Sequence, residues 1–309
     1  MQSNSLFSFL CHAIQKYIAG TTIPSTMKVS VITPTLNRVH FIEDAMDSVL
    51  WQTYSELEYI VIDGGSTDGT LDLLDEYKGK FRQVGKEMKY ISEKDNGLYD
   101  AMNKGIAMAS GEVVGILNSD DFFNSEDCIA TIAESFADSD TEAVYADSYY
   151  VEANDVFCPV RCYSNKHFKP KWLLYGYIPD HETFYMKKEC YEKYGYIKPD
   201  YNRGGGDFEL LLRMLYIEKV KARYIDKVML TNRIGGVSTS GGLKMYIKRT
   251  EDAMHIYRMH NLKTCRYKQW LRYFYRLWNK LYIPKKYTNA AKEAQIWFAE
   301  RRKSDFVTP

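Results

Sequence analysis

The sequence lacks several patterns that define common classes of protein. Its six cysteines form no C-x-x-C pair and show no zinc-ligand spacing, a pattern that fits free thiols in a reducing cytosol. No apolar stretch reaches the roughly 18 residues that a membrane-spanning helix needs. Internal repeats and low-complexity tracts are also absent. We therefore expect a cytoplasmic globular protein and not an integral membrane protein.

The chain of 309 residues, with 45% hydrophobic content, is long enough to bury one large α/β core and an appended helical region. The first 26 residues differ from the rest, because a mildly apolar segment there is interrupted by His12, Gln15 and Lys16 and no basic segment precedes it. These features do not predict a signal peptide. Met27 opens directly onto a strand pattern, so we expect Met27 to be the natural start or residues 1–26 to be a loose extension.

Residues 28–119 alternate between β-branched apolar runs and helical patterns. The runs at 28–33, 58–63, 89–92 and 112–119 predict strands, and apolar residues at helical spacing separate them. Strand and helix in alternation imply right-handed crossovers and a mostly parallel sheet. The polar turns that follow these strands then share one edge of the sheet, the edge where ligands bind in such folds.

Two adjacent aspartates, Asp120 and Asp121, follow the last of these strands. Neighbouring carboxylates repel one another and are costly to desolvate, so a divalent cation or another fixed positive partner is a good reason to place them there. The alternative is that they cap a helix that starts near 124–126, because aspartate is a favoured N-cap residue.

The glycine-rich turn at 64–69 offers backbone donors to a phosphate. It is not the G-x-G-x-x-G dinucleotide fingerprint, however, and the chain has no G-x-x-x-x-G-K-[ST] loop. A nucleotide held by carboxylates, with its diphosphate bridged by a metal, fits these residues better.

The motifs TPTLNR, VIDGGSTDGT, EKDNGLYDAMNKGI and GEVVGILNSDDFF lie in this order between residues 29 and 123. Together they resemble the nucleotide-sugar-binding half of the family-2 inverting glycosyltransferases, which have the GT-A fold, and within them the bacterial branch that builds surface polysaccharide. Weaker similarity extends to residue 238. The resemblance implies a GT-A catalytic domain at 27–238, made of a nucleotide-sugar-binding half at 27–125 and an acceptor half at 126–238. A helical, basic and aromatic C-terminal region follows at 239–309.

The resemblance also implies roles for individual residues. Nucleotide-sugar binding falls on Thr33, Pro34, Arg38, Asp63, Asp95, Lys104, Asn118, Asp121 and His181. Thr33 and Pro34 would line the base pocket and Asp63 would accept a hydrogen bond from the nucleoside. The family's Asp-x-Asp motif falls on residues 118–120, so Asp120 would bind a divalent cation, Mn²⁺ or Mg²⁺. Asn118 departs from this motif, although its amide could still hydrogen-bond a ribose or a metal-bound water.

Asp207 takes the position of the family's catalytic base, at the mouth of a predicted helix after a glycine-rich loop. Gly206 stands where the family usually has a second acid. The alternative is that Asp207 is only an N-cap and that Glu209 favours the helix dipole. His181, in a stretch similar to the family's His-Gln-x-x-Phe, would contact diphosphate or acceptor, and the alternative for it is a structural histidine. A late loop at 233–238 resembles one that closes over the diphosphate, although flexibility also explains its paired glycines.

The chemistry implied by the resemblance is one in-line displacement with inversion at the sugar's anomeric carbon. The expected donor is a UDP-sugar, and the expected acceptor is a glycan or a polyprenyl-diphosphate-linked glycan. A non-catalytic, nucleotide-sugar-binding scaffold is the alternative, since Asn118 and Gly206 both depart from the acidic pattern. A sugar nucleotidyltransferase would need a glycine-rich basic loop directly after the first strand, where this chain has PTLNR.

The segment 263–286 carries eight basic residues and no acidic one. If it is helical, its basic stripe (Lys268, Arg272, Arg276, Lys280) lies opposite an aromatic and apolar side (Tyr267, Trp270, Phe274, Leu277, Trp278, Leu281). This pattern is typical of a helix on an anionic membrane surface and predicts a peripheral protein on the inner face of the cell membrane. The alternative is a tail helix whose aromatic side docks on the catalytic domain. No base-reading module accompanies the stripe, so we expect no nucleic-acid partner.

Overall fold

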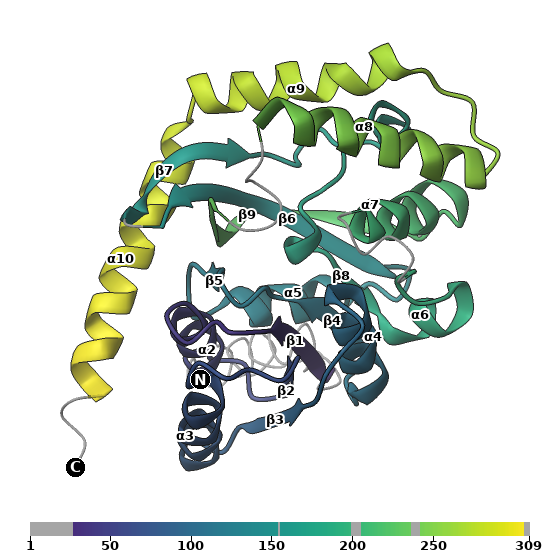
Figure 1. Ribbon diagram of the computed structural model, residues 1–309. Helices are drawn as coiled ribbons and strands as arrows, with labels where there is room; N and C mark the ends of the chain where they lie inside the picture. The colour runs from purple at the N-terminus through teal and green to yellow at the C-terminus, as the bar shows by residue number, and fades with distance from the viewer. Residues whose placement is uncertain (1–26, 154, 199–204, 236–241, 306–309) are drawn as a thin grey trace, which may run out of the picture.

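The computed structural model describes residues 27–153, 155–198, 205–235 and 242–305, and it has the expected α/β architecture (Figure 1). The first seven elements of these described residues alternate as predicted. They are β1 (Val29–Thr35), α2 (Ile42–Leu50), β2 (Leu57–Asp63), α3 (Thr70–Gln83), β3 (Glu87–Ser92), α4 (Leu98–Met108) and β4 (Val113–Ile116). The predictions for residues 1–26 lie outside the described residues.

The second half of the chain adds shorter elements and completes the sheet. They are β5 (Phe122–Phe123), α5 (Cys128–Ser135), β6 (Ala143–Glu152), β7 (Asp155–Tyr163), η1 (Pro170–Tyr175), η2 (His181–Thr183), β8 (Tyr185–Lys187), α6 (Lys188–Tyr194), α7 (Gly206–Leu211), the π-helical turn η4 (Leu212–Ile217) and β9 (Ala222–Arg233). Within the described part of the chain, the sheet has nine strands in the order β3-β2-β1-β4-β8-β6-β9-β5, with β7 paired to β6. From β3 to β4 the strands are parallel, whereas β8 runs antiparallel to β4 and β6.

Side chains along each strand point alternately to the two faces of the sheet, and helices cover both of these faces. Val29 and Val31 of β1 belong to one hydrophobic cluster with residues of α2, α3 and α5. Ile32, on the opposite face, belongs to a second cluster with residues of α4, α7 and α8. This double cover explains why β1 and β2 are buried along their whole length and why apolar residues of each strand face both ways.

The fourth strand is shorter than the sequence suggested, since β4 ends at Ile116 and not near residue 119. Leu117 still donates a backbone hydrogen bond to Ile32, but the backbone N–H of Asp121 donates to the carbonyl of Asn118 and closes a turn. Asp120 and Asp121 therefore lie on a turn beyond the strand. They do not cap the next helix, because Asp127 holds the N-cap position of α5, so that alternative is wrong.

The C-terminal helices α8 (Gly242–Met259), α9 (Arg266–Leu281) and α10 (Lys285–Asp305) pack back on the rest of the molecule. In Figure 1, α8 and α9 lie along its upper side and α10 runs down its left side toward the first helices. Trp297 of α10 meets Trp51 edge to face, with ring centroids 5.7 Å apart. The predicted domain boundary at 238/239 lies outside the described residues. No helix in the described part of the chain is long and apolar enough to span a bilayer.

Candidate active site

The loops that follow β1 and β2 are joined by hydrogen bonds into one rim. The backbone N–H of Asn37 donates to Ser66 Oγ (2.7 Å), and that of Thr67 donates to Asn37 Oδ1 (2.9 Å). Arg38, which is half-buried, donates its backbone N–H to Thr70 Oγ1 at the start of α3 (3.1 Å). Two of the predicted motifs therefore form a single surface at the carboxyl edge of the sheet.

Asp63, at the end of β2, is fully buried and organises the turn at 64–69. Its Oδ2 accepts hydrogen bonds from the backbone N–H groups of Gly65 (3.0 Å) and Ser66 (2.9 Å) and from Ser92 Oγ (2.6 Å). Its Oδ1 accepts one from Ser66 Oγ. Since a carboxylate oxygen has about two acceptor positions, Oδ1 keeps one for a further donor.

The two predicted base-pocket residues of β1 are both buried. The hydroxyl of Thr33 faces the core, where it accepts a hydrogen bond from Tyr59 (3.0 Å), and Pro34 is buried beside it. Thr35 is opposite Asp63 in the β1–β2 register, and its buried Oγ1 has no hydrogen-bond partner among the described residues. Thr35 thus carries an unpartnered hydroxyl at this strand end, and it was not identified as a site residue from the sequence.

Asp95 comes close to the same rim from the loop before α4. A Cβ atom added to Gly64 would lie 2.7 Å from Asp95 Oδ2, so only glycine fits at this position without movement. Asp95 Oδ1 accepts a hydrogen bond from the backbone N–H of Gly97 (2.8 Å). The Lys104 ammonium, in the middle of α4, is paired with Glu93 (2.8 Å).

Arg233, the last residue of β9, ties down the turn that carries Asp120 and Asp121. Its Nη1 donates to the carbonyl oxygen of Asp120 (2.5 Å), and its backbone N–H donates to Asp121 Oδ1 (2.7 Å). Its Nη2 reaches the carboxylate of Asp44 on α2. The guanidinium also lies 5.2 Å from the ring centroid of Phe122, so one side chain connects β9, α2 and the aspartate turn.

A buried pair of acids, Asp121 and Glu182, lies behind this turn. Burial, together with the charge of Asp120, raises the pKa of Asp121, and burial with the charge of Asp121 raises the pKa of Glu182 well above its usual range. The two carboxyl groups are hydrogen-bonded to each other, and Glu182 Oε1 also accepts the backbone N–H of Asn118 (2.8 Å). A proton shared between the two acids removes the repulsion between their carboxylates, and Glu182 then holds the 118–121 turn in place.

Asp120 differs from its neighbour because it is partly exposed, and no described residue donates a hydrogen bond to its carboxylate. No group of three or more His, Cys, Asp or Glu side chains within the described ranges is arranged to hold a metal ion. One free carboxylate nevertheless suits a cation that takes most of its other ligands from phosphates and water, as Mg²⁺ does. The Asn118 amide is turned inward toward Asp121 Oδ2 (3.4 Å).

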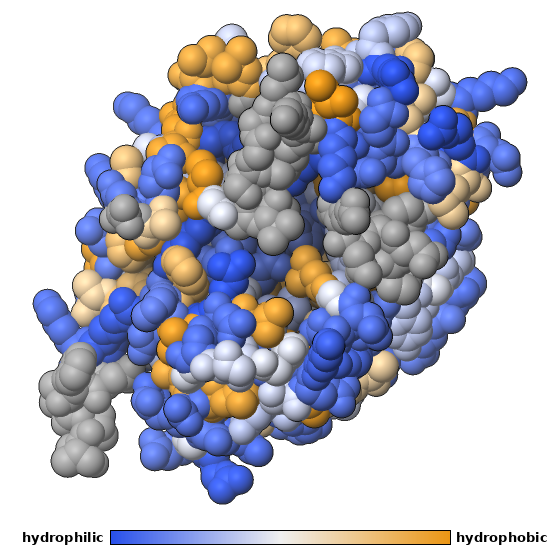
Figure 2. All heavy atoms as spheres, in the orientation of Figure 1, coloured by the Kyte–Doolittle hydropathy of each residue, from blue (hydrophilic) through white to orange (hydrophobic). Residues whose placement is uncertain are grey.

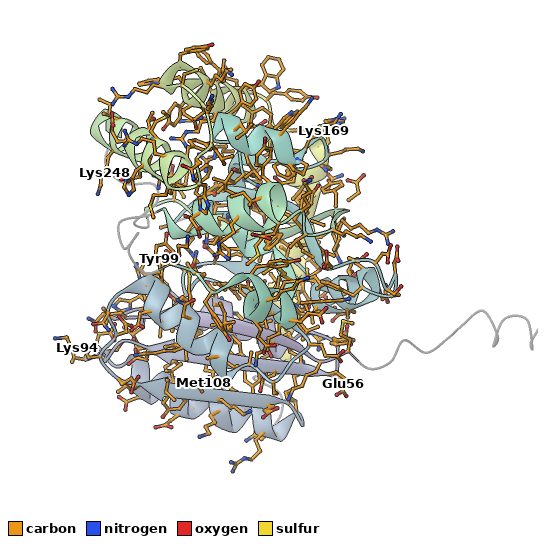
Figure 3. The ribbon with its side chains drawn as sticks, turned by 90° about the vertical axis from the view of Figure 1, so that its right-hand side faces the viewer. Glu56, Lys94, Tyr99, Met108, Lys169 and Lys248 are labelled. Carbon is orange, nitrogen blue, oxygen red and sulfur yellow. The ribbon has the colours of Figure 1, made fainter. Side chains whose placement is uncertain are left out.

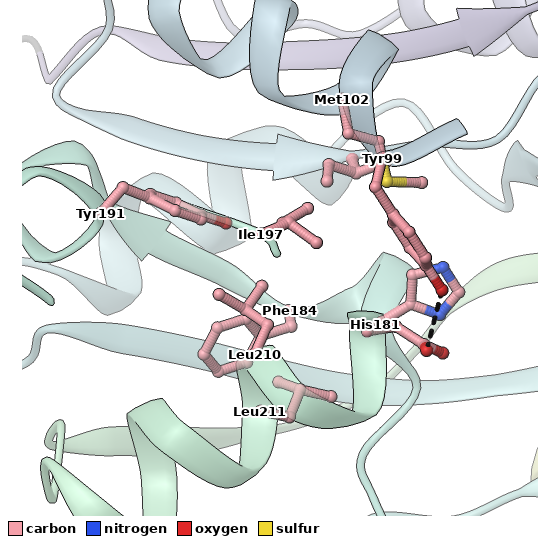
Figure 4. Close-up of a pocket in the computed structure, with 10 residues that line it drawn as sticks. Tyr99, Met102, His181, Phe184, Tyr191, Ile197, Leu210 and Leu211 are labelled. Atoms are coloured by element: carbon pink, nitrogen blue, oxygen red, sulfur yellow. Dashed lines mark hydrogen bonds between the residues drawn. The ribbon is translucent and has the colours of Figure 1, made fainter. Parts of the chain in front are cut away.

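Asp207 lines a small pocket together with Tyr99, His181 and Ile197 (Figure 4). Its Oδ1 accepts a hydrogen bond from the Tyr99 hydroxyl (3.3 Å), and burial with the charge of Asp207 raises the pKa of Tyr99. Asp207 is the second residue of α7, and Gly205 occupies the N-cap position without a side-chain cap. The alternative that Asp207 serves only as an N-cap is therefore wrong.

Tyr99 also explains why glycine precedes Asp207. A Cβ atom at Gly206 would lie 2.8 Å from the Tyr99 ring, so a second acid at this position would collide with it. In Figure 3, α4 runs from Tyr99 near the middle of the molecule to Met108 below, which places Tyr99 where the two halves meet. The departure from the family pattern at Gly206 is thus a packing requirement of this chain.

His181 joins the aspartate turn to the pocket. Its imidazole reaches the same end of the pocket as the Tyr99 ring (Figure 4), and its neighbour Glu182 holds the turn at 118–121. Asp120 is not among the residues that line the pocket. Within the late loop at 233–238, residues 236–238 lie outside the described residues.

Besides Thr35, three residues of the site were not identified from the sequence, namely Tyr99, Glu182 and Arg233. All three lie inside stretches that resemble the family, and their positions in those stretches were the available signal. Their contacts could not be predicted from the sequence, because each is hydrogen-bonded to a residue 64 or more positions away, as Glu182 is to Asn118.

Comparison with known proteins gives the family. Residues 30–195, more than half of the chain, match the family "Glycosyl transferase family 2". A glycosyltransferase of Mycobacterium bovis named for PGL/p-HBAD biosynthesis is 27% identical over 222 residues, 71% of this chain and 82% of that protein. Glycosyltransferase GlyG of Streptococcus pneumoniae is 29% identical over 127 residues, 41% of each chain.

Solved structures agree on the fold. The mannosyltransferase PcManGT of Pyrobaculum calidifontis, in complex with GDP-Man and Mn²⁺, superposes with a TM-score of 0.55 at 20% identity, over 90% of this chain and 75% of that one. S. aureus TarS superposes with a TM-score of 0.54 at 20% identity, over 75% of this chain and 40% of TarS. The sheet order, the family match and these neighbours lead to one conclusion: the protein belongs to glycosyl transferase family 2 and is a glycosyltransferase with the GT-A fold.

Proposed function

We propose that this glycosyltransferase transfers a sugar from a nucleotide-sugar donor to a hydroxyl group of a glycan or a polyprenyl-diphosphate-linked glycan, with inversion of the anomeric configuration. The proposed setting is cell-surface polysaccharide biosynthesis at the inner face of the cell membrane. The observation that carries the proposal is the position of Asp207, at a pocket that Tyr99 reaches from the donor half and His181 from the acceptor half.

The donor would lie along the rim formed by the loops after β1, β2 and β3. The free acceptor position of Asp63 Oδ1 and the unpartnered hydroxyl of Thr35 supply polar groups for the nucleoside. Arg38, Asp95 and Lys104 stand beside this rim. A UDP-sugar is the proposed donor, since structures of the neighbour TarS hold UDP and UDP-GlcNAc, while PcManGT was solved with GDP-Man.

Asp120 is the proposed ligand of a divalent cation, Mn²⁺ or Mg²⁺. When bound, such a cation neutralises charge on the departing nucleoside diphosphate. Arg233 and the Asp121–Glu182 pair hold the turn so that the Asp120 carboxylate stays available. Asn118, which points at Asp121, leaves the metal to Asp120 and to the donor's own oxygens.

Asp207 is the proposed general base. Its carboxylate takes the proton from the acceptor hydroxyl while that oxygen bonds to the sugar's anomeric carbon and the bond from this carbon to the diphosphate oxygen breaks. Attack opposite the leaving group inverts the configuration in a single step. The hydrogen bond from Tyr99 orients one oxygen of Asp207 and leaves the other for the acceptor.

Donor turnover tests the proposal. The full chain should release nucleoside diphosphate slowly from one member of a nucleotide-sugar panel, with Mn²⁺ required, and the same donor should raise the thermal unfolding temperature. Asp207→Asn should lower transfer to an acceptor by about 10² to 10⁴-fold while donor binding persists. Asp72→Asn, at an exposed position in the first turn of α3, is the matched control. Silence across the whole panel would support a non-catalytic scaffold instead.

A further inference from the structure

Helix α9 packs with its polar side against the rest of the protein. Gln269, Arg272 and Asn279 are its buried residues, with 0%, 9% and 6% of their surface exposed. Gln269 Nε2 donates to the carbonyl of Leu174 in η1 (2.8 Å), and Arg272 Nη2 donates to Thr250 Oγ1 in α8 (3.4 Å). An amphipathic helix of a globular protein normally buries its apolar side, so this arrangement is inverted.

The opposite side of α9 is apolar and open to solvent. Its residues recur at helical spacing and are between 40% and 75% exposed: Tyr267, Trp270, Leu271, Phe274, Leu277, Trp278 and Leu281. We call this set the apolar face of α9. Figure 2 shows apolar atoms along the upper rim of the molecule, where α9 lies in Figure 1. An exposed apolar face of this extent marks an interaction surface.

This arrangement corrects two expectations from the sequence. The aromatic side does not dock on the catalytic domain, so that alternative is wrong. The predicted basic stripe is not an open surface either, because Arg272 is buried and Lys268 is half-buried against the Tyr175 ring (5.6 Å). Lys280 is exposed, and the side chain of Arg276 is outside the described residues.

We infer that the apolar face of α9 inserts into the surface of an anionic lipid bilayer. The charges around the face favour this partner, because the segment 263–286 has no acidic residue and Lys263, Lys280 and Lys285 are exposed near its ends. A second copy of the chain would set one positively charged helix against another, whereas anionic headgroups supply the missing negative charge. Tryptophan and tyrosine are also the side chains favoured at the boundary between headgroups and hydrocarbon.

Contacts through α8 link helix α9 to the pocket that Asp207 lines. The Tyr257 hydroxyl of α8 donates to Gln269 Oε1 of α9 (3.3 Å), and the Tyr257 ring packs edge to face on Phe208, next to Asp207, with centroids 5.5 Å apart. The membrane would thus fix the height of the pocket above the bilayer. This part rests on the proposed function, in which the acceptor is carried on a lipid.

Vesicle binding by the full chain tests the inference. The protein should sediment with vesicles of phosphatidylcholine and phosphatidylglycerol, and far less with phosphatidylcholine alone. Phe274→Ser/Trp278→Ser should weaken partitioning by about tenfold for each side chain removed, because each withdraws apolar surface from the lipid. The matched control is Val84→Ser/Ile296→Ser, two apolar residues that are each 57% exposed elsewhere. Brominated lipids should quench tryptophan fluorescence, since Trp270 and Trp278 are exposed while Trp51 and Trp297 are buried.

Three results would overturn the inference: no binding to anionic vesicles at low salt, equal binding by the Phe274→Ser/Trp278→Ser variant, or a dimer in analytical ultracentrifugation that this variant splits. Donor hydrolysis in solution separates the two proposals. If vesicle binding holds while no donor is turned over, the proposed function fails alone. If donors are turned over without vesicle binding, the membrane inference fails alone.

Discussion

Replacing Arg233 with alanine should destabilise the fold and raise the Mn²⁺ concentration that donor turnover requires. The Arg233 side chain is only 6% exposed, and its guanidinium contacts the Asp120 carbonyl, the Asp44 carboxylate and the face of the Phe122 ring at once. Breaking a buried ion pair costs about 3 to 5 kcal/mol when the partner is left without a counter-charge. Asp44 is 21% exposed and keeps Arg302 as a second partner, so we expect a smaller loss of about 2 to 4 kcal/mol.

Urea unfolding at neutral pH measures this loss, and Arg301→Ala is the matched control. Arg301 pairs with Glu126 through side chains that are 42% and 43% exposed, and such surface pairs are worth about 0 to 1 kcal/mol. Arg233→Lys should fall between the two variants, because a lysine keeps the charge but cannot bridge two oxygens with a planar fork.

The second readout is the concentration of Mn²⁺ needed for half-maximal donor hydrolysis. It should rise for Arg233→Ala, since Asp120 loses the contact that positions its backbone, and it should stay unchanged for Arg301→Ala. The reasoning would be refuted if the Arg233 variant lost no more stability than the Arg301 variant and kept the same Mn²⁺ requirement.

Three further outcomes follow. Asp120→Asn should abolish Mn²⁺-dependent stabilisation by nucleoside diphosphate in thermal-shift assays, and an unchanged shift would exclude Asp120 as a metal ligand. Gly206→Asp should cost about 1 to 3 kcal/mol in urea unfolding by overpacking against Tyr99, whereas Gly79→Ala, in open space on α3, should gain about 0.5 to 1 kcal/mol. Burial raises the pKa of Glu58, but hydrogen bonds from two serines and a lysine outweigh it and lower this pKa from 4.5 to about 2. Glu58 therefore stabilises the fold above pH 4.5, and this contribution of about 3 kcal/mol disappears as the pH falls toward 2; Glu58→Gln should lack that dependence.

Much of the first half of the molecule could be predicted from the sequence. The alternation of β-branched runs with helical spacing placed β1 to β3 and α2 to α4 within a few residues, because helices cover both faces of the sheet and the central strands therefore carry apolar residues on both sides. The end of β4 was predicted too late. Leu117 continues the apolar run, but the turn closed by Asp121 and Asn118 ends the strand at Ile116.

The position of each polar group at the rim was harder to predict than its presence. Asp63 and Thr33 were both expected to face a nucleotide, yet the carboxylate of Asp63 is largely occupied by its own turn and Thr33 faces Tyr59. Local sequence states which side chains can accept hydrogen bonds. Only the packed structure determines which donors reach them first.

By itself, the sequence determined the alternating α/β order, the edge at which the acidic turns gather and the two-sided character of the helix at 266–281. Only the tertiary structure decided which side of that helix is covered, because periodicity defines a face without saying what lies against it. Hydrogen bonds from Gln269 to Leu174 and from Tyr257 to Gln269 hold the polar side inward, and so the apolar face is left outside. In the same way, Glu182 and Arg233 meet the aspartate turn through long-range contacts that no local pattern encodes.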